Sequence, residues 1–81
     1  MIRLFGSDEC FECREVISFL KKNHILYFYV DAMFDDFDID ALCERYNVDE
    51  LPHIQKLDGN NEVIEEGIGF EQTMKILKNL I

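Results

Sequence analysis

The sequence predicts an α/β fold with four strands and three helices in the order βαβ, α, ββα. Apolar runs at residues 2–5 and 25–30 have the length of strands, and a helical apolar pattern lies between them. A helix that joins two strands is typical of a parallel βαβ unit. Further along, residues 58–61 (Asp-Gly-Asn-Asn) are a hairpin turn signal between two more strands. Together the parallel unit and the hairpin predict a four-stranded mixed sheet.

The first helix is expected to begin near Cys10, because apolar residues then recur at the spacing of one helix face. These residues are Cys13, Val16, Ile17 and Leu20. Lys21 and Lys22 favour a helix C-terminus there, and Asn23 is expected to end the helix in a left-handed conformation. The run 25–30 contains only β-branched, aromatic or leucine residues and predicts a buried strand. Its aromatic residues, expected to pack in the sheet, are Tyr27, Phe28 and Tyr29.

A second helix is expected after the acidic segment 35–40, because negative charge is favourable near a helix N-terminus. Its apolar face comprises Ile39, Leu42, Cys43 and Tyr46. Strands are expected at 52–57 and 62–66, followed by a glycine-containing break and a helix that begins at Phe70. The apolar stripe of this last helix comprises Phe70, Met74, Leu77 and Ile81.

Length and charge argue against several classes of protein. The 81 residues predict a single domain, 1–81, with a modest core. The net charge is −9, and the eight Lys and Arg residues form no cluster, so neither nucleic acid nor an anionic membrane surface is expected as a partner. No apolar run approaches the ~20 residues that a membrane span requires. We expect a monomer.

The cysteines and the N-terminus predict the cellular compartment. Three cysteines, an odd number, fit a reducing compartment with one working pair better than a disulfide scaffold. The first apolar stretch is interrupted by Arg3 and is too short for the apolar region of a signal peptide. A cytoplasmic location is therefore expected.

The most informative motif is Cys-Phe-Glu-Cys at residues 10–13, which follows a short strand and opens a helix. This spacing places both sulfurs on one side of the helix start, close enough to form a disulfide. The partial positive charge and free N–H groups of a helix N-terminus favour the thiolate form of the first cysteine. A thiolate attacks disulfides, so the motif indicates dithiol–disulfide chemistry. Phe11 has no helix-face reason to be buried and is expected to contact a partner beside the thiol.

A metal site is the alternative interpretation of the same cysteines. Its ligands would be Cys10, Cys13, Cys43 and His53. Cys43, however, lies on the apolar face of the second predicted helix, which is typical of a packed core residue. His24 and His53 are expected to be structural or exposed rather than catalytic. The sequence therefore favours a redox pair and no metal.

The sequence resembles the thioredoxin superfamily, and most closely the glutaredoxins and glutaredoxin-like thioredoxins (redoxins). Four landmarks occur in the family's order: the Cys-x-x-Cys motif 10–13, Glu-Leu-Pro at 50–52, the hairpin 58–61, and Gly-Ile-Gly-Phe at 67–70. The resemblance spans essentially the whole chain. It implies a thioredoxin-like three-layer sandwich, with a cis proline at Pro52 that faces the cysteines.

The resemblance also implies an activity and a site. The protein would be a small thiol–disulfide oxidoreductase that reduces protein disulfides, an electron carrier with no bound cofactor beyond its redox-active disulfide. Cys10 would be the nucleophile and Cys13 the resolving cysteine. The residues expected to bind the substrate are Phe11, Leu51, Pro52, Gly69 and Phe70. The alternative is a non-enzymatic interaction or zinc-binding module that kept the fold.

Departures from the family pattern concern the electron donor. Glutaredoxins usually carry Pro-Tyr between the cysteines and thioredoxins Gly-Pro, where this chain has Phe11 and Glu12. Asp8 and Glu9 replace a basic residue common before the glutaredoxin motif, and Glu71 matches the glutathione-binding stretch only in part. Glutathione, an anion, remains a candidate donor but is expected to bind poorly. The entry to the last helix is similar to that of redoxins that thioredoxin reductase reduces and that serve ribonucleotide reductase.

Overall fold

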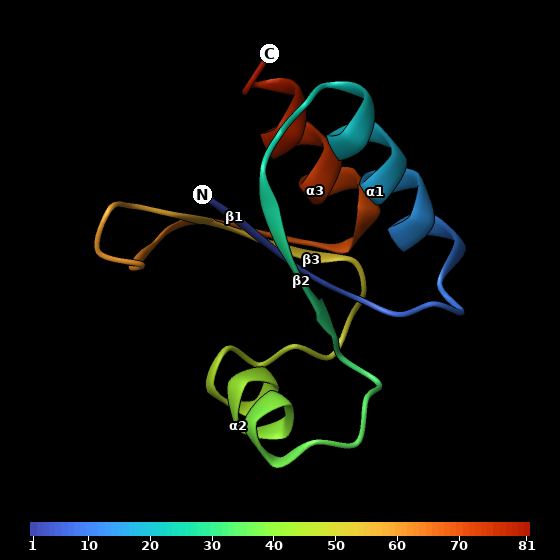
Figure 1. Ribbon diagram of the computed structural model, residues 1–81, viewed down its shortest axis with the longest axis vertical. Helices are drawn as coiled ribbons and strands as arrows, with labels where there is room; N and C mark the ends of the chain where they lie inside the picture. The colour runs from blue at the N-terminus through green and yellow to red at the C-terminus, as the bar shows by residue number, and fades with distance from the viewer.

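A computed structural model of the protein describes residues 1–81 as a four-stranded sheet with helices on both faces (Figure 1). Its elements are β1 (Ile2–Gly6), α1 (Phe11–Lys22), β2 (Tyr27–Asp31), α2 (Phe37–Arg45), β3 (His53–Leu57), β4 (Val63–Ile68) and α3 (Gly69–Lys78). Helices α1 and α3 lie side by side, and α2 lies apart from them. The predicted order of elements is confirmed.

The sheet is mixed, as the sequence predicts. Its strand order is β2-β1-β3-β4. Strand β1 is parallel to β2 and antiparallel to β3, and β3 is antiparallel to β4. Strand β1 lies in the interior of the sheet. The loop that follows Gly6 therefore starts from the C-terminal end of a central strand and leads directly into α1.

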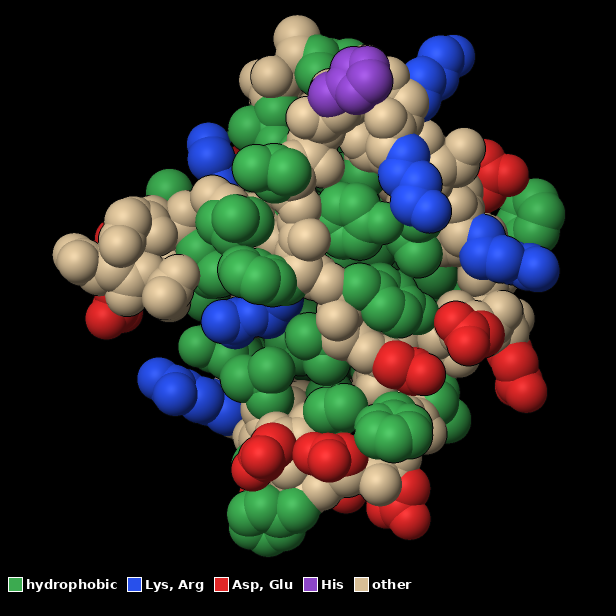
Figure 2. Space-filling model, in the orientation of Figure 1, with side chains coloured by type: hydrophobic (Ala, Val, Ile, Leu, Met, Phe, Trp, Pro, Cys, Tyr) green, Lys and Arg blue, Asp and Glu red, His purple; other side chains and the backbone are tan.

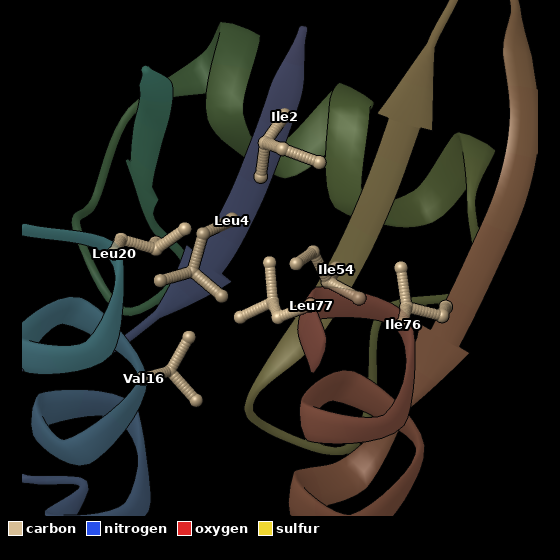
Figure 3. Packing of buried hydrophobic residues seen from close by; sticks show 7 residues of the cluster. All are labelled: Ile2, Leu4, Val16, Leu20, Ile54, Ile76 and Leu77. Atoms are coloured by element: carbon tan, nitrogen blue, oxygen red, sulfur yellow. The ribbon is translucent and has the colours of Figure 1, made fainter. Parts of the chain in front are cut away.

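The main core fills the space between the sheet and the helix pair α1 and α3 (Figure 3). It consists of Ile2, Leu4, Val16, Leu20, Ile54, Ile76 and Leu77. Side chains alternate between the two faces of a strand, so the apolar residues of β1 and β3 meet those of the helices. Each fully buried aliphatic side chain contributes roughly 1.5–3 kcal/mol.

Helix α2 is attached far more loosely to the other face. None of its residues is fully buried, and its predicted apolar face is only half-buried. Asp36 caps its N-terminus by accepting hydrogen bonds from the N–H groups of Asp38 and Ile39. The prediction that Cys43 is a packed core residue is wrong, since its side chain is also half-buried.

Three local predictions differ from the structure. Strand β2 is an edge strand in which no residue is fully buried, and Leu26 and Phe28 of the predicted run are 77% and 57% exposed, so the prediction of a buried strand is wrong. Helix α1 ends at Asn23 with φ of −99°, and the left-handed residue is His24, with φ of 55°. Helix α3 buries Thr73 and Ile76 together with Leu77, whereas Ile81 lies beyond the helix.

Candidate redox site

Cys10 and Cys13 form a disulfide at the start of α1, with their Cα atoms 5.2 Å apart. Cys10 is the N-cap residue, and its Sγ accepts a hydrogen bond from the Cys13 N–H at 3.1 Å. Cys13 is completely buried, whereas Cys10 is partly exposed. An N–H group directed at Sγ stabilises negative charge there. The Cys10 sulfur is therefore the partly exposed one, and it is the one that receives an N–H hydrogen bond at the helix start.

The strand-to-helix connection holds the disulfide close to the sheet. The N–H of Cys10 donates to the carbonyl of Ser7 at 3.1 Å, and the hydroxyl of Ser7 accepts from the N–H of Glu9 at 3.3 Å. Gly6 lies directly beneath Cys13: a Cβ at Gly6 would lie 3.3 Å from the Cys13 sulfur and 3.0 Å from the ring of Tyr29. A Cβ at Gly6 would have to displace these neighbours by a few tenths of an ångström, so a glycine favours this close approach of backbone to sulfur.

The loop before β3 and the start of α3 form a second wall of the site. The Leu51–Pro52 peptide bond is cis, as the sequence resemblance implies. The carbonyl of Pro52 accepts a hydrogen bond from the N–H of Gly69 at 2.8 Å, which joins this loop to α3. The backbone groups of Leu51 make no hydrogen bond within the protein.

A cavity of about 560 Å³ lies between α1, this loop and the start of α3. It is lined by Glu12, Glu50, Ile68, Gly69, Phe70, Glu71 and Gln72. The structure thus places two predicted substrate-binding residues, Gly69 and Phe70, in one cavity with Glu12 of the Cys-x-x-Cys motif. Sequence reasoning missed Glu50 and Gln72, although Glu50 directly precedes the Leu-Pro pair that drew attention to this loop.

No cation lines this cavity. The guanidinium of Arg14 lies 6.0 Å from the ring centre of Phe11, a residue 66% exposed at the first turn of α1. Arg3 donates to Gln55 at 2.8 Å and lies over the ring of Tyr46 just after α2. The three glutamates of the cavity therefore have no ion-pair partner.

The four residues considered as zinc ligands do not come together. Cys10 is bonded to Cys13, and His53 contacts Glu66 through its Nε2 at 2.6 Å. Cys43 belongs to α2, and no group of His, Cys, Asp or Glu side chains forms a metal-binding arrangement.

A polar network, unforeseen from the sequence, lies on the second face of the sheet. The carboxylate of Glu66 accepts from Gln55 at 2.8 Å and contacts buried His53, and Gln55 in turn accepts from Arg3. Burial raises the pKa of Glu66, but the hydrogen bonds of Gln55 and His53 and the His53 charge outweigh it, so the net pKa is lowered. Arg3, Gln55 and Glu66 are register partners on β1, β3 and β4, so their side chains lie on the same face of the sheet.

No family model and no curated protein matches the sequence, but solved structures do. Thioredoxin Deadhead from Drosophila melanogaster superposes with a TM-score of 0.72 at 22% identity, over 99% of this chain and 79% of its own. The chain has the thioredoxin fold. A thioredoxin-like protein matches with a TM-score of 0.70 at 23% identity over the full length of both chains. Plasmodium falciparum thioredoxin matches with 0.69 at 19%, over 98% and 79%.

These similarities show the fold. The Cys10–Cys13 disulfide lies at the start of the first helix of this thioredoxin fold. The thioredoxin fold is common to all of these neighbours, and none of them indicates a glutaredoxin subtype. None of the three helices has the length and apolar character needed to cross a membrane.

Proposed function

We propose that the protein is a small dithiol–disulfide oxidoreductase that reduces disulfides of other proteins through Cys10 and Cys13. The observation that carries this proposal is the asymmetry of the pair. Cys10 is partly exposed and receives an N–H hydrogen bond at Sγ, whereas Cys13 is buried next to it. In such a pair the exposed cysteine, Cys10, attacks the substrate as a thiolate, and the buried cysteine, Cys13, resolves the mixed disulfide.

The reaction proceeds in two exchanges. The Cys10 thiolate attacks a substrate disulfide, forms a mixed disulfide and expels one substrate thiolate. Cys13 then loses its proton and attacks the Cys10 sulfur, which forms the Cys10–Cys13 bond and releases the second substrate thiolate. The substrate gains two electrons, and the Cys10–Cys13 pair is oxidised by the same two electrons.

Substrate recognition is proposed to combine backbone and apolar contacts. The unpaired backbone of Leu51, next to Pro52, suits pairing with an extended substrate segment. Phe70, which lines the cavity, and Phe11, which is exposed within the Cys-x-x-Cys motif, offer apolar surface to a substrate. The substrate class is therefore a protein disulfide presented in an extended loop, and ribonucleotide reductase fits this class.

The electron donor is proposed to be a thioredoxin-type reductase rather than glutathione. Glutathione carries two carboxylates, and Glu12, Glu50 and Glu71 surround the cavity next to the disulfide without a compensating cation. Carboxylates within a Debye length of ~8 Å repel such a ligand in physiological salt. The Cys10–Cys13 disulfide would be reduced again in a reducing compartment such as the cytoplasm.

The proposal is tested by trapping. Cys13→Ser should accumulate a mixed disulfide with an oxidised protein substrate, since the resolving thiol is missing, and Cys10→Ser should form none. Cys43→Ser serves as the matched control, because it removes a cysteine from α2 without touching the pair, and it should retain full turnover. Trapping through Cys43, or equal reactivity of all three variants, would contradict the proposal.

The donor is tested separately by measuring turnover with glutathione and with a flavin-dependent thioredoxin-type reductase. Turnover with glutathione should be poor and should improve as salt screens the glutamates. Efficient glutathione-driven reduction at low ionic strength would show that the donor assignment is wrong.

A further inference from the structure

The ring of Tyr29 lies on the same side of Gly6 as the buried Cys13 sulfur, and the mechanism so far does not use its hydroxyl. A Cβ placed on Gly6 would lie 3.0 Å from a ring carbon of Tyr29 and 3.3 Å from the Cys13 sulfur. The ring and the sulfur are therefore neighbours on the same side of Gly6. The Tyr29 hydroxyl is completely buried and has no hydrogen-bond partner. A buried hydroxyl without a partner loses its bonds to water and costs free energy, so its retention calls for an explanation.

The charged groups that act on the Tyr29 hydroxyl belong to segments next to the Cys-x-x-Cys motif. Burial, and then the charges of Asp31, Asp8 and Tyr27, raise the pKa of Tyr29 above its ordinary value of 10.0. Asp8 belongs to the loop that enters the Cys-x-x-Cys motif, and Asp31 ends β2 opposite Gly6. The hydroxyl therefore keeps its proton at neutral pH and can act as a hydrogen-bond donor.

We propose that the Tyr29 hydroxyl donates a hydrogen bond to the Cys13 sulfur when that sulfur carries negative charge. In the disulfide state Cys13 is uncharged, and the hydroxyl has no partner. A thiolate at Cys13 is fully buried, without water to stabilise it, so a nearby donor has a large effect. This inference rests on the proposed function and adds to it the group that stabilises the inner sulfur.

The donor acts in both directions of the cycle. In the resolving step Cys13 attacks Cys10 as a thiolate and forms the Cys10–Cys13 bond. The bond from Cys10 to the substrate breaks, and the proton that Cys13 lost passes to the departing substrate sulfur on the exposed side of the pair. When a reductase thiolate later attacks Cys10, the Cys10–Cys13 bond breaks and Cys13 leaves as a thiolate. Tyr29 keeps its own proton throughout and lowers the energy of the Cys13 thiolate in each step.

Stopped-flow reduction of dithiobis(nitrobenzoate) separates the two exchanges in a Cys43→Ser background. Attack by Cys10 releases one coloured thiolate, and resolution by Cys13 releases the second. Tyr29→Phe should leave the first phase unchanged and slow the second roughly 10- to 100-fold, the usual effect of losing a hydrogen bond to a charged group. Unfolding by urea should show equal or higher stability, because the removed hydroxyl has no partner in the folded protein.

Tyr27→Phe is the matched control, because it removes a hydroxyl from the same strand next to Ile2 rather than next to the sulfur. Both phases should keep their parent rates in this variant. A second phase in Tyr29→Phe within about twofold of the parent, or an equal slowing in Tyr27→Phe, would overturn the inference while leaving the proposed function intact. A parent protein that releases no second thiolate would overturn both.

Discussion

The two faces of the sheet are built on opposite principles. The face under α1 and α3 is an apolar core of seven buried residues, and the disulfide lies at its end. The face under α2 carries the network of Arg3, Gln55, Glu66 and His53, and α2 buries no residue completely. The tightly packed core therefore lies on the face that carries the disulfide.

The surface shows the same division. Apolar side chains spread across the middle of the face in Figure 2, and acidic side chains gather near α2 at its lower end. The segment from β2 to α2 exposes Phe28, Met33, Phe34 and Phe37, from 57% to 84% of each side chain. A protein of this size tolerates such exposure because its stability comes from the other face.

Leu77→Ala should have the largest effect, a loss of about 2–5 kcal/mol of unfolding free energy, because it opens a cavity under α3. The matched change on the opposite face, Leu42→Ala, removes the same atoms from a half-buried position of α2 and should cost less than about half as much. Urea unfolding of both variants measures the difference. Equal losses would show that the two faces contribute alike.

Gly6→Ala should have the second largest effect, a loss of about 1–3 kcal/mol of unfolding free energy, because a Cβ would crowd the Cys13 sulfur and the Tyr29 ring. Gly59→Ala, in the open hairpin turn where a Cβ meets no atom, is the control for adding a methyl group. Thermal unfolding of the oxidised proteins checks this. A Gly6→Ala protein as stable as Gly59→Ala would mean that the disulfide is not held against the sheet.

The rate of alkylation should be about tenfold or more higher for Cys10 than for Cys43. Burial and then the charge of Asp40 raise the pKa of Cys43 above 9.0, so it is almost entirely a thiol at neutral pH. Cys10, which receives the N–H of Cys13, should react fastest in the reduced protein. Mass mapping after timed treatment with iodoacetamide measures each rate. Cys43 modified as fast as Cys10 would contradict the assignment of the nucleophile.

Glu66→Gln should have the smallest effect, below about 1 kcal/mol, because its side chain is 35% exposed and solvent screens the interaction. The pKa of Glu66 is lower in the folded protein than its ordinary value of 4.5, so its carboxylate stabilises the fold above that pH. This contribution disappears as the pH falls through the lowered pKa. Glu65→Gln, on the neighbouring residue without a partner, is the control.

The stability difference between Glu66→Gln and the parent should therefore be present at pH 7 and absent once the pH is well below 4.5. Urea unfolding at both pH values is the measurement. A difference that persists unchanged in acid would mean that the network does not depend on the carboxylate charge.

The sequence predicted the elements well because their patterns are local. The helical spacing of Cys13, Val16 and Leu20 defined α1, and those residues are fully buried. The prediction was less accurate for β2, because apolar composition does not distinguish an interior strand from an edge strand. The landmarks of the site, Cys10 and Pro52, were likewise visible as short motifs.

What remained hidden depends on contacts between distant segments. Glu50 and Gln72 line one cavity only because the loop before β3 is hydrogen-bonded to α3. Tyr29 looked like ordinary sheet packing, and its position next to the Cys13 sulfur follows from the register of β1 with β2 and from the absence of a side chain at Gly6. Such pairings are fixed by tertiary structure rather than by sequence pattern.

A single turnover tests the central claim most directly. The fully reduced protein, freed of reductant, is mixed with an excess of an oxidised protein substrate, and both products are mapped by mass spectrometry. One substrate disulfide should be reduced for each molecule that gains a Cys10–Cys13 bond, with Cys43 left as a free thiol. A protein that stays reduced, or whose main new bond contains Cys43, would contradict the account.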